Sequence, residues 1–138
     1  MKSNIFMLVI VILPLVIMAL VGCFPNIPLP DLVPDNPPGM AGYCNVDDSN
    51  NLIVYVKNQG EADAPASSVK VQFNLSSGIQ EFFGTVEAIP VGETKSVSFA
   101  IPFGCFNPDC DFTITVDSNE NVLESEELNN SANGSCVG

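Results

Sequence analysis

Apolar and polar residues alternate along short segments of the chain after Gly42, and clusters of turn-forming residues separate these segments. In the clearest segments every second residue is apolar, as at Leu52, Val54 and Val56. A period of two residues is typical of a strand that buries one face. The pattern therefore predicts clear strands over residues 52–57, 69–75, 96–101 and 112–116.

Weaker alternation adds strands around residues 43–46, 82–89 and 130–136, which gives about seven strands in total. No segment after Gly42 repeats apolar residues at the helical period. The pattern thus predicts one all-β domain over residues 43–138, a seven-stranded immunoglobulin-like β-sandwich. An antibody-type disulfide between the sheets is not expected, because the chain has no tryptophan and the clear strands carry no cysteine.

The chain begins with a basic residue, Lys2, and continues with an apolar run over residues 5–21. This is the layout of an export signal. The segment Leu20-Val21-Gly22-Cys23 resembles the lipobox of bacterial lipoproteins, which implies a signal peptide over residues 1–22 and lipid attachment at Cys23. The alternative is an uncleaved signal anchor, because the apolar run approaches the roughly 17 to 25 residues that cross a bilayer.

Residues 23–42 are rich in proline and have no periodic apolar pattern. Proline-rich segments favour an extended conformation that advances about 3.1 Å per residue. We therefore expect residues 23–42 to form a tether that holds the domain roughly 40 Å from the lipid. A proline-rich ligand for a partner domain is the alternative, although no basic residue flanks the prolines.

The chain beyond residue 22 is strongly acidic. It has three lysines, sixteen acidic residues and neither arginine nor histidine, so its net charge is 3 − 16 = −13. Such a surface repels nucleic acid and anionic headgroups, and we expect no nucleic-acid partner. The absence of histidine also removes the usual general base and the usual partner of a nucleophilic serine or cysteine. We therefore predict no enzymatic activity and no cofactor.

A more specific pattern runs through the predicted domain. It consists of Asn58-Gln59-Gly60, Pro90-Val91-Gly92, residues 112–117, Glu124, Glu127, Asn129 and Asn130. These residues resemble the CARDB domain, the cell-adhesion-related domain found in bacteria. The resemblance covers residues 41–138 and is most specific from residue 116 to residue 130. It implies a seven-stranded sandwich on exported or surface proteins, without an activity of its own.

In the topology that this resemblance implies, the four remaining cysteines lie at one pole of the sandwich, close to the entry of the tether. Four cysteines allow three connectivities. We favour Cys105 with Cys110, which closes a short loop, and Cys44 with Cys136, which joins the first strand to the last. The alternative is a zinc site of four thiolates, although the paired Cys-x-x-Cys spacing of such sites is missing.

The acidic segment after residue 116 offers a candidate metal site. Asp117, Asn119, Asn121 and Glu124 could supply the carboxylate and amide oxygens that calcium prefers. The segment is not an EF-hand, because Val122 stands where that loop needs glycine. We favour the alternative, a turn in which Asp and Asn side chains cap backbone N–H groups while the glutamates are solvated.

Together these features predict a lipoprotein of the cell envelope that faces outside the cytoplasm and acts as a non-catalytic adhesion or protein-interaction module. Its expected partners are the membrane, through the N-terminal lipid, and a surface protein or polysaccharide of unknown identity. Two other functions stay open, a purely structural envelope lipoprotein and a calcium-dependent carbohydrate-binding module. We expect a contact patch, if exposed, among Phe82, Phe83 and Phe106.

Overall fold

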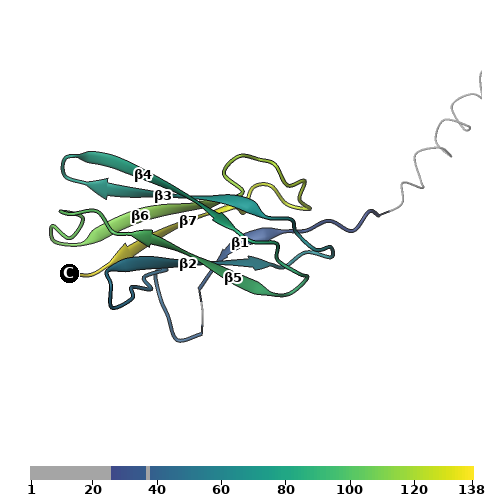
Figure 1. The fold of residues 1–138 in the computed structure, drawn as a ribbon, viewed down its shortest axis with the longest axis horizontal. Helices are drawn as coiled ribbons and strands as arrows, with labels where there is room; N and C mark the ends of the chain where they lie inside the picture. Colours follow the sequence, from purple (N-terminus) through teal and green to yellow (C-terminus); the bar gives the residue numbers. More distant parts are fainter. Residues whose placement is uncertain (1–25, 37) are drawn as a thin grey trace, which may run out of the picture.

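The computed structural model describes residues 26–36 and 38–138 of the chain. It contains two antiparallel sheets, with the strand order β1-β2-β5 in one and β4-β3-β6-β7 in the other. Figure 1 shows the sheets as two stacked layers. The strands are β1 (Leu32–Asp35), β2 (Asn51–Asn58), β3 (Ser67–Leu75), β4 (Gly78–Val86), β5 (Thr94–Ala100), β6 (Cys110–Val116) and β7 (Ser131–Cys136). The prediction of an all-β sandwich with seven strands is confirmed.

The predicted signal peptide over residues 1–22 and its lipid attachment point, Cys23, lie outside the described residues. Within the described residues, no helix is both long enough and apolar enough to cross a bilayer.

The inner positions of both sheets form one hydrophobic core. Alternate residues of β2 and β3 are buried there, which is the two-residue pattern visible in the sequence. Phe73 of β3 packs against Phe82 and Phe112, with ring centroids 5.7 and 5.9 Å apart. Aromatic pairs at this separation add to the stability that burial of their surface provides.

Strand β1 lies in the segment that the proline content assigned to a tether. Leu32 and Pro34 are buried, and Pro34 pairs with Val56 of β2. Because proline lacks a backbone N–H, it is tolerated in a strand at the edge of a sheet, and β1 is such a strand. The prediction of a tether over residues 23–42 is therefore wrong for residues 32–35, where the prolines hid a two-residue alternation.

The start of the domain moves with β1. The strand predicted at residues 43–46 is only a single bridge between Val46 and Leu52. Contacts with the sandwich begin earlier, at Leu29, whose carbonyl accepts a hydrogen bond from the Glu61 N–H at 2.8 Å. The domain thus begins near residue 29 and not at residue 43, and only residues 23–28 are left as a candidate tether.

The connecting loops gather at the two ends of the sandwich. Residues 26–31 reach the domain at one end, and the C-terminus lies at the other (Figure 1). We call the first end the entry pole; it comprises residues 26–31, 59–66, 87–93 and 117–130. We call the second end the disulfide pole; it comprises residues 38–50, 76–77, 101–109 and 137–138.

Candidate functional site

Asn58, at the end of β2, fixes the backbone of three segments at the entry pole. Its side chain is fully buried. The Oδ1 atom accepts hydrogen bonds from the N–H groups of Asp31 at 3.2 Å and Gly60 at 3.1 Å. The Nδ2 group donates to the carbonyls of Ala62 at 2.8 Å and Ile89 at 3.0 Å. One amide therefore holds the N-terminal segment, the β2–β3 loop and the loop before β5 together.

Gly60, the last residue of the Asn-x-Gly motif, lies against the backbone of the N-terminal segment. A Cβ atom at this position would lie 2.5 Å from the Leu29 carbonyl oxygen and 2.5 Å from the Asp31 nitrogen. Real Cβ atoms do not approach backbone this closely. Glycine is therefore required because the N-terminal segment passes directly over the motif.

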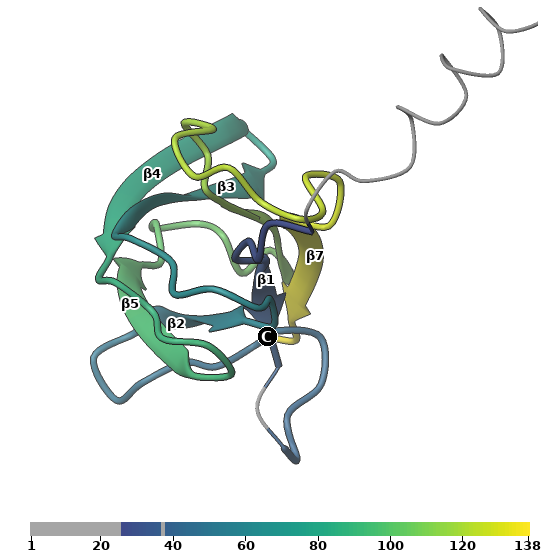
Figure 2. The ribbon, with the colours of Figure 1, turned by 90° about the vertical axis from the view of Figure 1, so that its right-hand side faces the viewer.

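The loop between β6 and β7 fastens the same segment from the other side. Figure 2, which looks onto the entry pole, shows residues 26–31 alongside this loop. The Ser125 N–H donates to the Pro30 carbonyl at 2.9 Å. The Asn129 Nδ2 group donates to Asp31 Oδ1 at 2.8 Å. The residues that suggested CARDB from the sequence thus hold the start of the domain in place.

Glu124 is a buried carboxylate in this loop. Its Oε2 atom accepts a hydrogen bond from the Leu32 N–H, and its Oε1 atom accepts one from Asn130 Nδ2 at 2.9 Å. Burial raises the pKa of Glu124 to about 7, although these two hydrogen bonds act to lower it. The expectation that the glutamates of this segment are solvated is wrong for Glu124, because its carboxylate serves as an acceptor inside the fold.

Asp117 caps the turn that begins this loop. Its two carboxylate oxygens accept the N–H groups of Asn121 at 3.3 Å and Val122 at 2.9 Å. Asn119 and Asn121 are exposed, and Glu124 is engaged with β1. In the parts of the chain that the structure describes, no three acidic, histidine or cysteine side chains are grouped so that they could hold a metal ion. The capping interpretation thus holds for Asp117, and Glu124 is engaged elsewhere in the fold.

A hollow of 680 Å³ runs along the same loop. Leu123 and Leu128 line it together with Asp117, Glu120 and Glu127. Catalytic pockets bring a nucleophile or a base together with a group that orients it. The lining contains no cysteine and no lysine, and the whole chain has no histidine. The hollow therefore lacks the catalytic pairs that depend on cysteine, lysine or histidine.

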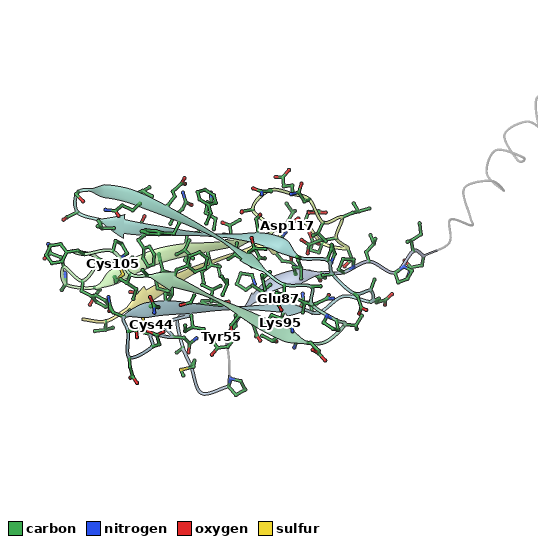
Figure 3. The ribbon with its side chains drawn as sticks, in the orientation of Figure 1. Cys44, Tyr55, Glu87, Lys95, Cys105 and Asp117 are labelled. Carbon is green, nitrogen blue, oxygen red and sulfur yellow. A yellow bond between two sulfur atoms is a disulfide. The ribbon has the colours of Figure 1, made fainter. Side chains whose placement is uncertain are left out.

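The four cysteines lie at the opposite end of the molecule, at the disulfide pole (Figure 3). Cys44 is bonded to Cys136 and Cys105 to Cys110, which are the pairs favoured from the sequence. We had expected these cysteines near the entry of the N-terminal segment, and that expectation is wrong. The reason is β1, which carries the chain from the entry pole along the sandwich before residue 44 is reached.

The phenylalanines proposed for a contact patch have different environments. Phe82 packs against Phe73 in the core. Phe83 is 64% exposed on the outer face of β4, and Phe106 is 39% exposed in the disulfide loop. Among the described residues, the most exposed aromatic side chain is one that we did not name, Phe103, at 102%. Its position between Pro102 and Gly104, in a loop with no alternation, was the available signal.

Comparisons with known proteins agree with this fold. The sequence model of the CARDB family matches residues 29–134. The CARDB domain of a Pyrococcus furiosus protein, solved in complex with di-metal ions, is 25% identical with a TM-score of 0.54, over 79% of this chain and 93% of that one. A domain of a Methanosarcina acetivorans protein described as a cell surface protein is 23% identical with a TM-score of 0.58, over 79% of this chain and 91% of that one. No curated protein matches the chain.

Proposed function

Because the chain belongs to the CARDB family, we propose that it is a non-catalytic adhesion or protein-interaction module that a lipid on Cys23 holds outside the cytoplasm. CARDB domains are modules of surface proteins without an activity of their own, as the resemblance of the sequence already implied. The lack of cysteine, lysine and histidine in the lining of the hollow at the entry pole is consistent with this function.

The observation that carries the proposal is the separation of the two poles. Residues 26–31 reach the domain at the entry pole, and the disulfide pole lies at the other end (Figure 3). Leu29, the first residue fixed to the sandwich, follows Cys23 by six residues, which span at most about 20 Å. A lipid on Cys23 would therefore keep the entry pole close to the membrane and leave the disulfide pole free to meet a partner.

The two disulfides support a location outside the cytoplasm, because oxidising compartments allow such bonds to persist. Their burial supports a structural role. Cys105, Cys110 and Cys136 are each 2% exposed or less, so solvent reductants have little access to them.

The anchor is tested by labelling cells that express the full chain with radioactive palmitate. We expect the wild-type chain to carry the label in the membrane fraction and Cys23→Ala to lose it. Surface biotinylation of intact cells at Lys57, Lys70 or Lys95 then reports which side of the membrane the domain occupies. Retention of palmitate by Cys23→Ala, or biotinylation only after lysis, would contradict the anchored, outward-facing arrangement.

Binding is tested with the purified full chain in detergent, added to intact cells and to isolated surface polysaccharide. Saturable binding to either supports the interaction function. Binding to neither would favour the alternative, a purely structural envelope lipoprotein. The related Pyrococcus furiosus domain was solved with di-metal ions, but the acidic residues considered as calcium ligands here cap a turn or bind backbone. We therefore do not propose a calcium-dependent carbohydrate-binding function.

A further inference from the structure

The disulfide pole presents one aromatic side chain entirely to solvent. Phe103 is 102% exposed, whereas most phenylalanines of the described chain contact the core or a neighbouring loop. Single exposed leucines or valines are common on soluble proteins and need no explanation. A side chain this exposed buries almost no surface on folding, so it is free to contact a partner.

The backbone that carries Phe103 is held in one conformation. The Cys105 N–H donates to the Pro102 carbonyl at 3.2 Å, and Gly104 has a φ of 85°, so residues 102–105 form a tight turn with Phe103 at its tip. A positive φ at this position favours glycine. The turn therefore displays the ring on a defined backbone, which lowers the entropy that binding must overcome.

Both ends of the loop are fastened to the sandwich. Before the turn, Ile101 is buried and its N–H donates to the Asn50 carbonyl at 3.2 Å. After the turn, the disulfide joins Cys105 to Cys110, the first residue of β6, and both sulfurs are buried. An aromatic side chain on a fixed loop is typical of the anchor residues at protein interfaces.

The loops of the disulfide pole carry other exposed apolar side chains and acidic side chains. Phe106, three positions further along the chain, is 39% exposed, and Val137, which follows the last residue of β7 at the same pole, is 84% exposed. Asp109 joins this loop to the C-terminus, because its Oδ1 atom accepts a hydrogen bond from the Gly138 N–H at 3.3 Å. All three described lysines lie on strands, and the loops of the disulfide pole carry none.

We propose that Phe103 is the anchor of a protein-binding surface, with Phe106 and Val137 at the same pole, and that its partner presents an apolar pocket bordered by lysine or arginine. The inference rests on the proposed function, of which it names the contact surface and the partner chemistry. Asp109 in the disulfide-bonded loop, and the absence of lysine from the loops of this pole, are complementary in charge to a pocket with a basic border.

The charges also argue against other occupants. A second copy of the chain would bring a net charge of −12 to an acidic pole, and anionic lipid headgroups would be repelled in the same way. A neutral polysaccharide could stack on the ring but would leave Asp109 without a positive partner. A protein with an apolar pocket bordered by lysine or arginine offers a contact for the Phe103 ring and a positive partner for the Asp109 carboxylate.

Site-specific photo-crosslinking tests this surface. The photoreactive analogue p-benzoylphenylalanine replaces Phe103 in the full chain, expressed in its own cells. A matched variant carries it at Phe83, which is 64% exposed but lies on β4. We expect one discrete protein adduct from position 103 and at least tenfold less of it from position 83. Adducts to lipid, to polysaccharide or to a second copy, equal yields at both positions, or no adduct would overturn the proposal.

Competition connects the adduct to the Phe103 side chain itself. Excess wild-type chain should abolish the adduct, while Phe103→Ala should need about 30-fold more protein to do so. The yield of the adduct should also fall at high salt, because salt screens the attraction between Asp109 and the basic residues of the partner. Equal competition by both chains would overturn the proposal. Since Phe103 is fully exposed, its replacement should leave the melting temperature unchanged, and that measurement shows whether the competitor is folded.

The same proteins separate this inference from the function on which it rests. If the wild-type chain and Phe103→Ala bind intact cells equally well, the interaction function stands and the assignment to Phe103 fails. If the wild-type chain binds neither cells nor surface polysaccharide, the proposed function itself fails.

Discussion

Glu124 accepts a hydrogen bond from the backbone N–H of Leu32, which precedes it by 92 residues and is the first residue of β1. A carboxylate is thus used inside the fold to fix the position of an edge strand. Because the side chain is 5% exposed, burial disfavours its charged form and raises its pKa to about 7. We therefore expect the stability of the junction between the N-terminal segment and the sandwich to depend on pH.

We predict that Glu124→Gln makes stability less dependent on pH. The pKa of Glu124 is raised from an ordinary value of 4.5 to about 7, so the folded state holds its proton more tightly than the unfolded state. The resulting stabilisation is complete below pH 4.5 and is lost as the pH rises through about 7. Its full size is up to about 3 kcal/mol.

Urea unfolding of the wild type and of Glu124→Gln, at intervals from pH 4 to pH 9, measures this effect. The difference in unfolding free energy between the two proteins should shift in favour of Glu124→Gln as the pH rises. Glu126→Gln is the matched control, because Glu126 is exposed in the same loop. Parallel curves for the wild type and Glu124→Gln would show that Glu124 does not titrate in this range.

Asn58→Ala should be among the most destabilising single substitutions in the chain. It removes the partner of two N–H groups and two carbonyls at a fully buried position. Leaving such groups without a partner costs about 2–4 kcal/mol in unfolding free energy. Asn74→Ala is the control at an exposed position on β3, and it should change the unfolding free energy by less than about 0.5 kcal/mol.

The two disulfides should contribute unequally to stability. Cys44 and Cys136 are 92 residues apart, and Cys105 and Cys110 are 5 apart. In the chain-entropy account, removing the first bridge costs about 4–5 kcal/mol and removing the second about 2 kcal/mol. Unfolding of the double variants Cys44→Ala/Cys136→Ala and Cys105→Ala/Cys110→Ala in denaturant compares them. Equal losses would mean that loop length does not determine their effect.

Asp117→Ala should lower the melting temperature by the same amount with calcium and with chelator. The carboxylate caps the N–H groups of Asn121 and Val122, and loss of such a cap costs about 1–2 kcal/mol. Calorimetric titration of the wild-type chain with calcium should give no binding heat. A calcium-dependent rise in melting temperature that Asp117→Ala abolishes would restore the metal interpretation.

Local alternation predicted most of the fold, because β2, β3 and β6 bury every second residue against one core and β5 turns Val97 and Phe99 toward it. It failed at β1. Leu32 and Pro34 occupy buried positions, but Pro34 looks like a strand breaker unless the strand is known to lie at an edge. Whether a strand lies at an edge depends on the pairing of the whole sheet, so the four residues of β1 alone do not reveal it.

In the candidate site too, roles that depend on nearby residues could be predicted and roles that depend on distant residues could not. Asp117 caps groups only four and five residues away, so its role followed from local turn chemistry. Glu124 and Asn58 bind backbone that is distant in sequence, and nothing near them in the chain indicates that partner. Phe103 was overlooked because full exposure follows from the turn and the disulfide together, and sequence alone does not show which way the ring points.

The course of the N-terminal segment also determines how the domain would bear force. If a lipid holds Cys23 while a partner holds the disulfide pole, tension enters at residues 29–32 and runs parallel to β1. The hydrogen bonds that join β1 to β2, and those that Asn58 and Glu124 make to Asp31 and Leu32, lie across that line. They would be loaded together in shear, and would not open one after another as in a peeled hairpin. An anchored adhesion module would thus carry its firmest junction where the pull arrives.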